Sequence, residues 1–124
     1  MELPSPTPSP IAQLASVPAP ISTTADIEAE IRRVFGSQAN TAIAVAWAES
    51  SMRPGTINSV GCCVGLFQIH VTAHAAKIPG TTREAKIAWL QVAKNNIALA
   101  KQIYDTSGWY PWEAYTKGAY KHYL

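Results

Sequence analysis

Residues 42–50, AIAVAWAES, and residues 65–69, GLFQI, decide the fold of this chain. The first stretch is apolar almost all round a helix, so it predicts a buried core helix with the carboxylate of Glu49 near its C-terminal end. Pro54-Gly55 stops that helix, and a loop over 56–64 leads into a short apolar strand that contains one amide, Gln68. Together the two stretches predict a single acid in a cleft, opposite a wall that can bind a polymer. This arrangement is typical of glycoside chemistry.

The segments on either side predict a mainly α (α+β) fold, with a small β element beside the buried helix. The apolar spacing predicts helices over about 25–35 and 38–51, a strand at 65–70 with or without a hairpin partner, a brief helix near 71–77, a long helix from Thr81-Thr82 to about Thr106, and an aromatic-rich helical segment from Pro111 to Leu124. Thr23-Thr24, Ser37 and Thr81-Thr82 are expected to cap helix starts, and Gly36 and Gly108 are expected to end helices.

The first twenty residues differ in composition from the rest of the chain. They hold six of the nine prolines, alternating with Ser, Thr and Ala, and such a segment stays extended and hydrated because it cannot bury a core. We therefore expect residues 1–22 to be a disordered Pro-rich linker or arm and residues 23–124 to be one domain. The arm is either a simple tail or a tether in a larger assembly.

Charge and hydropathy give few indications of partners. The formal net charge is +2, and the Lys and Arg residues are scattered, which argues against nucleic acid as a partner. No apolar run approaches the ~20 residues that a membrane span needs. Met1 is followed by an acidic residue and prolines, so a secretory signal peptide is not expected. A target outside the cytoplasm would then be reached by another route.

The only cysteines, Cys62 and Cys63, are adjacent. Consecutive Cα atoms lie ~3.8 Å apart, below the usual ~4.4–6.8 Å of a disulfide, so a bond between them is not expected. We expect two small, semi-buried residues in a tight loop, which gives no indication of the redox compartment.

Glu49 is the main candidate for a catalytic residue. Its place at the C-terminal end of a buried helix penalises ionisation through burial and through the negative end of the helix macrodipole. Both effects raise the pKa of the carboxyl, as a general acid needs near neutral pH. The alternative is a surface glutamate in a last helical turn.

Several spaced motifs resemble a known family. Glu49-Ser50-Ser51-Met52-Arg53-Pro54, Asn58-Ser59-Val60-Gly61 and Gly65-Leu66-Phe67-Gln68-Ile69 resemble the pattern of the soluble lytic transglycosylases and their goose-type lysozyme relatives. Ala114-Tyr115-Thr116-Lys117-Gly118 is similar to that family's A-Y-N-x-G element, and Gly108-Trp109-Tyr110-Pro111-Trp112 is similar to a stretch in phage-borne members. The match covers about residues 38–124, and it implies a lysozyme-like domain.

The resemblance implies roles for individual residues. Glu49 corresponds to the family's single catalytic acid/base, and the C-terminal aromatics either form a platform for sugar rings or pack the core. The substrate-binding residues that we expect are Asn58, Phe67, Gln68, Ile69, Trp112, Tyr115 and Thr116. The chain departs from the family pattern by one extra residue between Gly61 and Gly65, by Thr116 in place of Asn and by Met52 in place of an aromatic residue.

The supply of carboxylates bears on the mechanism. Glycosidases usually use two, ~5–5.5 Å apart when they retain configuration and ~6.5–9.5 Å apart when they invert it. No other Asp or Glu lies between Glu49 and Ile78, and Glu84 and Glu113 each suit a first-turn helix position without any catalytic role. We therefore expect the nucleophile to come from the substrate. In lytic transglycosylases the C6 hydroxyl of muramic acid attacks its own C1 and leaves a 1,6-anhydro end.

The resemblance therefore implies a lytic transglycosylase, a lyase that degrades cell-wall peptidoglycan at the MurNAc-GlcNAc β-1,4 bond. Two alternatives stay open: a goose-type lysozyme that hydrolyses the bond, and a catalytically weak virion structural or wall-binding module of the same fold. His70 and His74 are four residues apart, but no Glu follows His70 and no third ligand is close, so we expect no metal and no cofactor.

The expected partners are peptidoglycan glycan strands, with other virion proteins as further partners through the arm. The expected setting is a bacteriophage virion or a phage-delivered endolysin that acts on the bacterial cell wall. A bacterial enzyme delivered by another route is the alternative.

Overall fold

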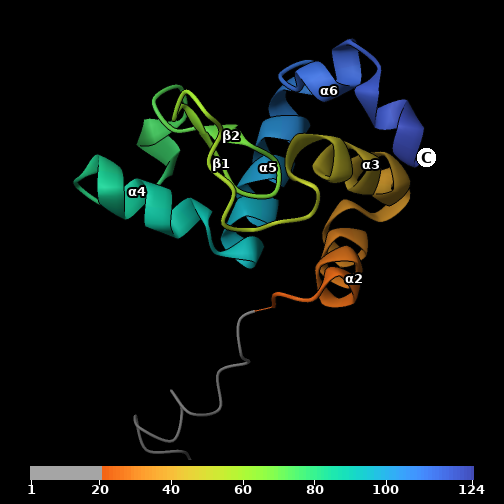
Figure 1. Cartoon of the computed structure of the whole chain (residues 1–124), viewed down its shortest axis with the longest axis horizontal. Coiled ribbons are helices and arrows are strands. Elements are labelled where there is room, and N and C mark those ends of the chain that lie inside the picture. The colour runs from red at the N-terminus through yellow and green to blue at the C-terminus, as the bar shows by residue number, and fades with distance from the viewer. Residues whose placement is uncertain (1–20) are drawn as a thin grey trace, which may run out of the picture.

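The computed structural model describes residues 21–124, so the predicted arm lies almost entirely outside the described residues. The described chain forms α2 (Thr24–Phe35), η1 (Gly36–Gln38), α3 (Ala39–Ser50), β1 (Cys63–Val64), β2 (Ile69–His70), η2 (Ala75–Lys77), α4 (Arg83–Leu90), α5 (Ala93–Ser107), α6 (Glu113–Thr116) and η3 (Ala119–Tyr123), where η marks a 3-10 helix (Figure 1). The predicted mainly α fold with a small β element is confirmed. Within residues 21–124, no helix combines the length and the apolar character needed to cross a membrane.

The first two helices form as the sequence predicts. The Thr23 hydroxyl caps α2 by accepting the N–H of Asp26 at 3.1 Å, and Gly36 ends it. Ser37 does not cap α3, because it lies within η1 and Gln38 is the N-cap residue. α3 is buried on nearly every side, and α2 and α5 pack in the same core. α3 ends at Ser50, before Pro54, and its C-cap residue Ser51 has a left-handed backbone with φ +54°.

The predicted strand over 65–70 is wrong in its first four residues. β1 pairs antiparallel with β2, with Cys63 opposite His70, and the turn between them spans residues 65–68. Gly65 and Gln68 have φ values of +85° and +48°, and such left-handed residues cannot continue a strand. A Cβ on Gly65 would also collide with the side chain of Asn96, so this turn requires glycine.

The predicted long helix from residues 81–82 to 106 is two helices. Thr82 caps the start of α4, accepting the N–H of Ala85 at 3.0 Å, and Gly108 ends α5, both as predicted. The chain breaks at Gln91 and Val92, because Val92 is extended. Asn95 and Asn96 stabilise the break by donating side-chain hydrogen bonds to the carbonyls of Trp89 and Leu90.

Two further segments differ from the predicted helices. Residues 71–74 are a turn, and only Ala75–Lys77 form a 3-10 helix. The C-terminal segment is not one helix, because Gly118 with φ +86° separates α6 from η3. This segment packs on α3, where the rings of Tyr123 and Trp47 stack with centroids 6.1 Å apart. In Figure 1, α6 and η3 lie near α3, and α4 lies on the other side of the hairpin.

Candidate functional site

A cavity of about 480 Å³ lies between the end of α3, the hairpin with its preceding loop, and the segment that leads into α6. Both polar and apolar side chains line it. Its lining residues are Glu49, Asn58, Cys62, Cys63, Gln68, Ile69, His70, His74, Ile103, Pro111, Trp112 and Glu113.

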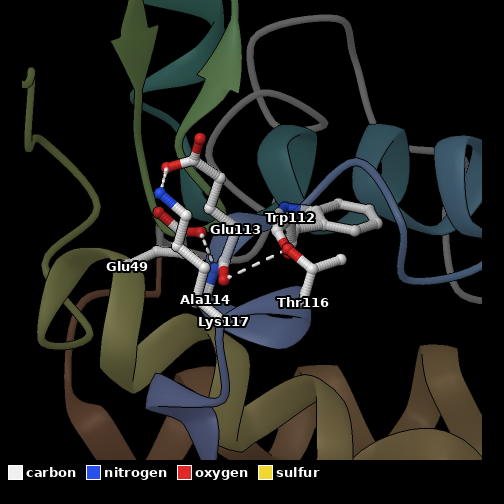
Figure 2. Close-up of polar contacts among 6 residues, drawn as sticks. All are labelled: Glu49, Trp112, Glu113, Ala114, Thr116 and Lys117. Atoms are coloured by element: carbon white, nitrogen blue, oxygen red, sulfur yellow. Dashed lines mark hydrogen bonds and ion pairs between the residues drawn. The ribbon is translucent and has the colours of Figure 1, made fainter.

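Glu49 lies in the last turn of α3, half-buried, at one side of this cavity. Its Oε2 accepts the N–H of Ala114 at 3.4 Å, so the carboxyl group reaches the first turn of α6 (Figure 2). Burial raises the pKa of Glu49 above its ordinary value, the hydrogen bond from Ala114 lowers it in part, and the negative charge of Glu113 raises it again. A carboxyl group in these surroundings keeps its proton to a higher pH than a solvated glutamate does.

Glu113 is a second carboxylate on the same cavity. Its side chain is largely exposed, and its Oε1 lies 3.6 Å from Nζ of Lys117, one helical turn later (Figure 2). The sequence suggested only a favourable first-turn position for Glu113. That it faces the same cavity as Glu49 depends on how the short α6 packs against α3, and no sequence pattern shows this.

Two polar residues that we expected to bind substrate, Gln68 and Asn58, lie on the hairpin side of the cavity. Gln68 donates from Nε2 to the carbonyls of Thr56 and Gly65, at 3.1 and 3.0 Å, which fixes its amide against the turn. The Oδ1 of Asn58 accepts the N–H of Cys62 at 3.0 Å. Asn58 therefore orders the loop as well as lining the cavity.

Cys62 and Cys63 form a disulfide, and the expectation of two unbonded thiols is wrong. Their Cα atoms lie 3.8 Å apart, as in any adjacent pair joined by a trans peptide bond, which is closer than in most disulfides. Both residues are half-buried, as expected, and both line the cavity.

The two histidines lie on the same cavity. Nδ1 of His70 accepts the N–H of Ala73 at 3.2 Å, so His70 caps the turn after β2. Burial lowers the pKa of His74, and the positive charges of Lys77 and His70 lower it further. Among residues 21–124, no group of three or more His, Cys, Asp or Glu side chains could hold a metal ion.

The expected substrate-binding residues divide into two groups. Asn58, Gln68, Ile69 and Trp112 lie around the cavity with Glu49. Phe67 does not, because its ring is fully buried against Phe35 and Trp112. Tyr115 and Thr116 line a separate hollow with Tyr110, Lys117, Gly118, Tyr120 and Lys121. The structure therefore does not bring these three residues to the cavity.

Sequence reasoning missed Pro111, Ile103, the histidines, the disulfide and Glu113 as cavity-lining groups. Trp112 is placed there by a buried hydrogen bond, since its Nε1 donates to the carbonyl of Phe67 at 2.9 Å. For the part of the cavity lined by Pro111 and Trp112, the aromatic content of residues 109–112 was the only feature of the sequence that indicated a role in binding.

Searches of curated proteins and of solved structures found no match to this chain. The family model described as "Lysozyme like domain" matches residues 31–114. That range contains α3 with Glu49, the hairpin, and the start of α6. Because the match covers more than half of the sequence, the chain belongs to the lysozyme-like domain family.

Proposed function

We propose that this domain is a peptidoglycan lytic transglycosylase in which Glu49 is the single general acid/base. Lysozyme-like domains generally act on peptidoglycan, which supports glycan strands as the substrate class. The observation that carries the proposal is a half-buried carboxyl group of raised pKa, which lines a cavity together with Gln68 and Trp112.

In the proposed reaction, protonated Glu49 gives its proton to the oxygen of the MurNAc-GlcNAc β-1,4 bond, and that bond breaks. The C6 hydroxyl of the muramic acid then attacks C1, and the Glu49 carboxylate takes the hydroxyl proton. The products are a free GlcNAc hydroxyl and a 1,6-anhydro-MurNAc end, so no water is consumed. One residue serves first as acid and then as base.

One observation favours a second candidate, hydrolysis as in goose-type lysozymes. Glu113 lies on the same cavity as Glu49, and a second carboxylate can activate a water molecule against C1. A third candidate is a wall-binding module that has little or no activity. The resemblance of residues 108–112 to phage-borne members supports a phage virion or lysin as the setting, with the N-terminal arm as a contact to other virion proteins.

The test is mass spectrometry of muropeptides released from purified sacculi by the wild type, Glu49→Gln and Glu84→Gln. The proposal expects products that lack one water relative to reducing ends. It also expects Glu49→Gln to lose activity by about 10²–10⁴-fold, the typical contribution of a general acid. Glu84→Gln is the matched control, because Glu84 is an exposed carboxylate in α4 away from the cavity.

Reducing ends would instead establish hydrolysis. Full activity of a folded Glu49→Gln protein would remove Glu49 from the mechanism. Absence of any product from the wild type would favour the binding module.

A further inference from the structure

The Cys62–Cys63 disulfide is a part of the cavity that the proposed chemistry does not use. Both residues are half-buried and line the cavity, and they are the only cysteines in the sequence. In the chain-entropy account, a disulfide stabilises a fold by closing a loop of the unfolded chain, and the effect grows with the length of that loop. Adjacent residues enclose no loop, so we expect this bond to act locally rather than on global stability.

Hydrogen bonds within the protein satisfy the backbone of this pair. The Oδ1 of Asn58 accepts the N–H of Cys62 at 3.0 Å and that of Cys63 at 3.4 Å. The Cys62 carbonyl accepts the N–H of Val71 at 2.9 Å, and the Cys63 carbonyl accepts the N–H of Asn58 at 3.0 Å. The Asn58 side chain also contacts a sulfur atom, because its Nδ2 donates to Sγ of Cys62 at 3.2 Å. With the backbone groups occupied, the pair has its disulfide to offer the cavity, and sulfur is polarisable and accepts hydrogen bonds only weakly.

The rest of the cavity wall is amphipathic. Ile69 and Trp112 supply apolar surface, whereas Glu49, Gln68 and Glu113 supply polar groups. An N-acetylated hexosamine has the same mixed character, because hydroxyl and amide groups surround an apolar ring face and an acetamide methyl group. A rigid apolar contact complements such a sugar without competing for its hydrogen bonds.

On the basis of the proposed function, we infer that the Cys62–Cys63 disulfide is a binding determinant for an N-acetylated sugar unit of the glycan. Its sulfur atoms pack against the apolar groups of the sugar, and the cavity binds glycan tightly only while the bond is intact. Reduction takes up two electrons and two protons and replaces the S–S bond with two thiols. The two thiols rotate independently, so glycan binding must then order both side chains at a cost in free energy.

The experiment measures the Kd of the Glu49→Gln protein for a soluble tetramer of N-acetylglucosamine, since this variant is expected to bind without cleaving. One sample is untreated, and the other is treated with a phosphine, which is oxidised to its oxide with oxygen from water. Intact mass verifies the gain of two hydrogen atoms, and circular dichroism verifies the fold. We expect reduction to weaken binding by roughly tenfold.

Two loop variants in the same background complete the experiment. The Cys62→Ala/Cys63→Ala double variant should bind as the reduced protein does and should not respond to phosphine. Val60→Ala should respond as the parent does, because Val60 lies in the same loop, is 81 % exposed and is not part of the cavity lining. If the double variant does not fold, the reduction of the parent decides alone.

Equal Kd values before and after verified reduction would overturn the inference, as would two free thiols in the untreated protein. These failures are distinct from failure of the proposed function. Anhydro products with redox-insensitive binding would overturn the disulfide's role alone. Redox-sensitive binding of the tetramer without any cleavage of sacculi would overturn the transglycosylase proposal alone.

Discussion

Two carboxylates on one cavity have different surroundings. Glu49 is half-buried at the end of α3 and accepts one long hydrogen bond from the backbone of α6. Glu113 is largely exposed, close to the ammonium group of Lys117. When two carboxyl groups in one site have environments of different polarity, their pKa values differ, and the two groups can take different roles. The half-buried residue is therefore the one suited to hold a proton.

The charge of Glu113 should influence the pH range of activity. That charge raises the pKa of Glu49, although burial is the larger cause. Glu113→Gln removes the charge with little change in size, so the pKa of Glu49 should fall. Because Glu49 is proposed to act in its protonated form, the high-pH limb of the kcat/KM profile should move to lower pH. The measurement is a pH–rate profile on soluble glycan fragments at constant ionic strength.

The control for this prediction is Glu84→Gln, which should leave the limb in place. The other titratable groups around Glu49 are the side chains of His70 and His74 on the cavity and of Lys117 beside Glu113, and all of them are present in both proteins. A limb that does not move would show that Glu113 has no electrostatic effect on Glu49. Loss of nearly all activity in Glu113→Gln would instead favour a second catalytic carboxylate and hence hydrolysis.

At the scale of elements, Asn96 of α5 holds the hairpin turn against the helices. It is fully buried, its Oδ1 accepts the N–H of Phe67 at 2.9 Å, and its Nδ2 donates to the carbonyls of Val64 and Leu90 at 2.9 and 3.0 Å. One side chain thus connects both sides of the turn and the end of α4. The position of Gln68 on the cavity depends on this turn.

Asn96→Ala should destabilise the fold strongly. It removes the hydrogen bonds of Asn96 to three buried backbone groups, and each group that is left unsatisfied costs about 1–3 kcal/mol. We expect the free energy of unfolding in urea to fall by roughly 3 kcal/mol or more. The comparison is Asn95→Ala, which removes a single hydrogen bond, to Trp89, from a half-buried residue. Similar losses in the two variants would contradict a special role for Asn96.

The same residue explains why the sequence did not predict the helix break. Apolar residues recur at helical spacing from Ile87 to Ile103, so the pattern predicts one long helix. The break depends on side-chain amides that bond to the carbonyls of Trp89 and Leu90 and to the distant residue Phe67. Such long-range partners do not appear in a local pattern. The turn at Gly65 was missed for the same reason, since Asn96 lies 31 positions away.

At the scale of the whole molecule, the buried helix and its carboxylate were predictable, whereas the far wall of the cavity was not, apart from Trp112. The alanine-rich sequence of α3 shows its burial directly, and a carboxylate in its last turn follows from the periodicity. The far wall comes from residues 109–113, whose path depends on Trp109 packing on Phe35 and on Trp112 binding the carbonyl of Phe67. The local sequence gave no reason for Trp112 and Tyr115 to face different hollows.

The state of Glu49 should also be visible in the stability of the whole molecule. Its pKa in the folded protein is raised above the ordinary value of 4.5 that applies in the unfolded chain. Between these two values the unfolded chain binds fewer protons than the folded protein, so the free energy of unfolding falls as pH rises through this window. Above the folded pKa the loss is complete, because the fold then contains an ionised carboxylate in a half-buried place.

Glu49→Gln cannot ionise, so it should be more stable than the wild type at about pH 7 and close to it at about pH 4, where the carboxyl is mostly protonated in both states. Urea unfolding at the two pH values measures the difference, and Glu84→Gln should show no such change. His74 and Glu30, whose pKa values are lowered in the fold, add their own pH dependence equally to both proteins. If the free energy of unfolding of Glu49→Gln at neutral pH is no higher than that of the wild type, the ionised carboxyl of Glu49 does not destabilise the fold. A gain that comes with lost activity would show a fold destabilised by the group on which its proposed chemistry depends.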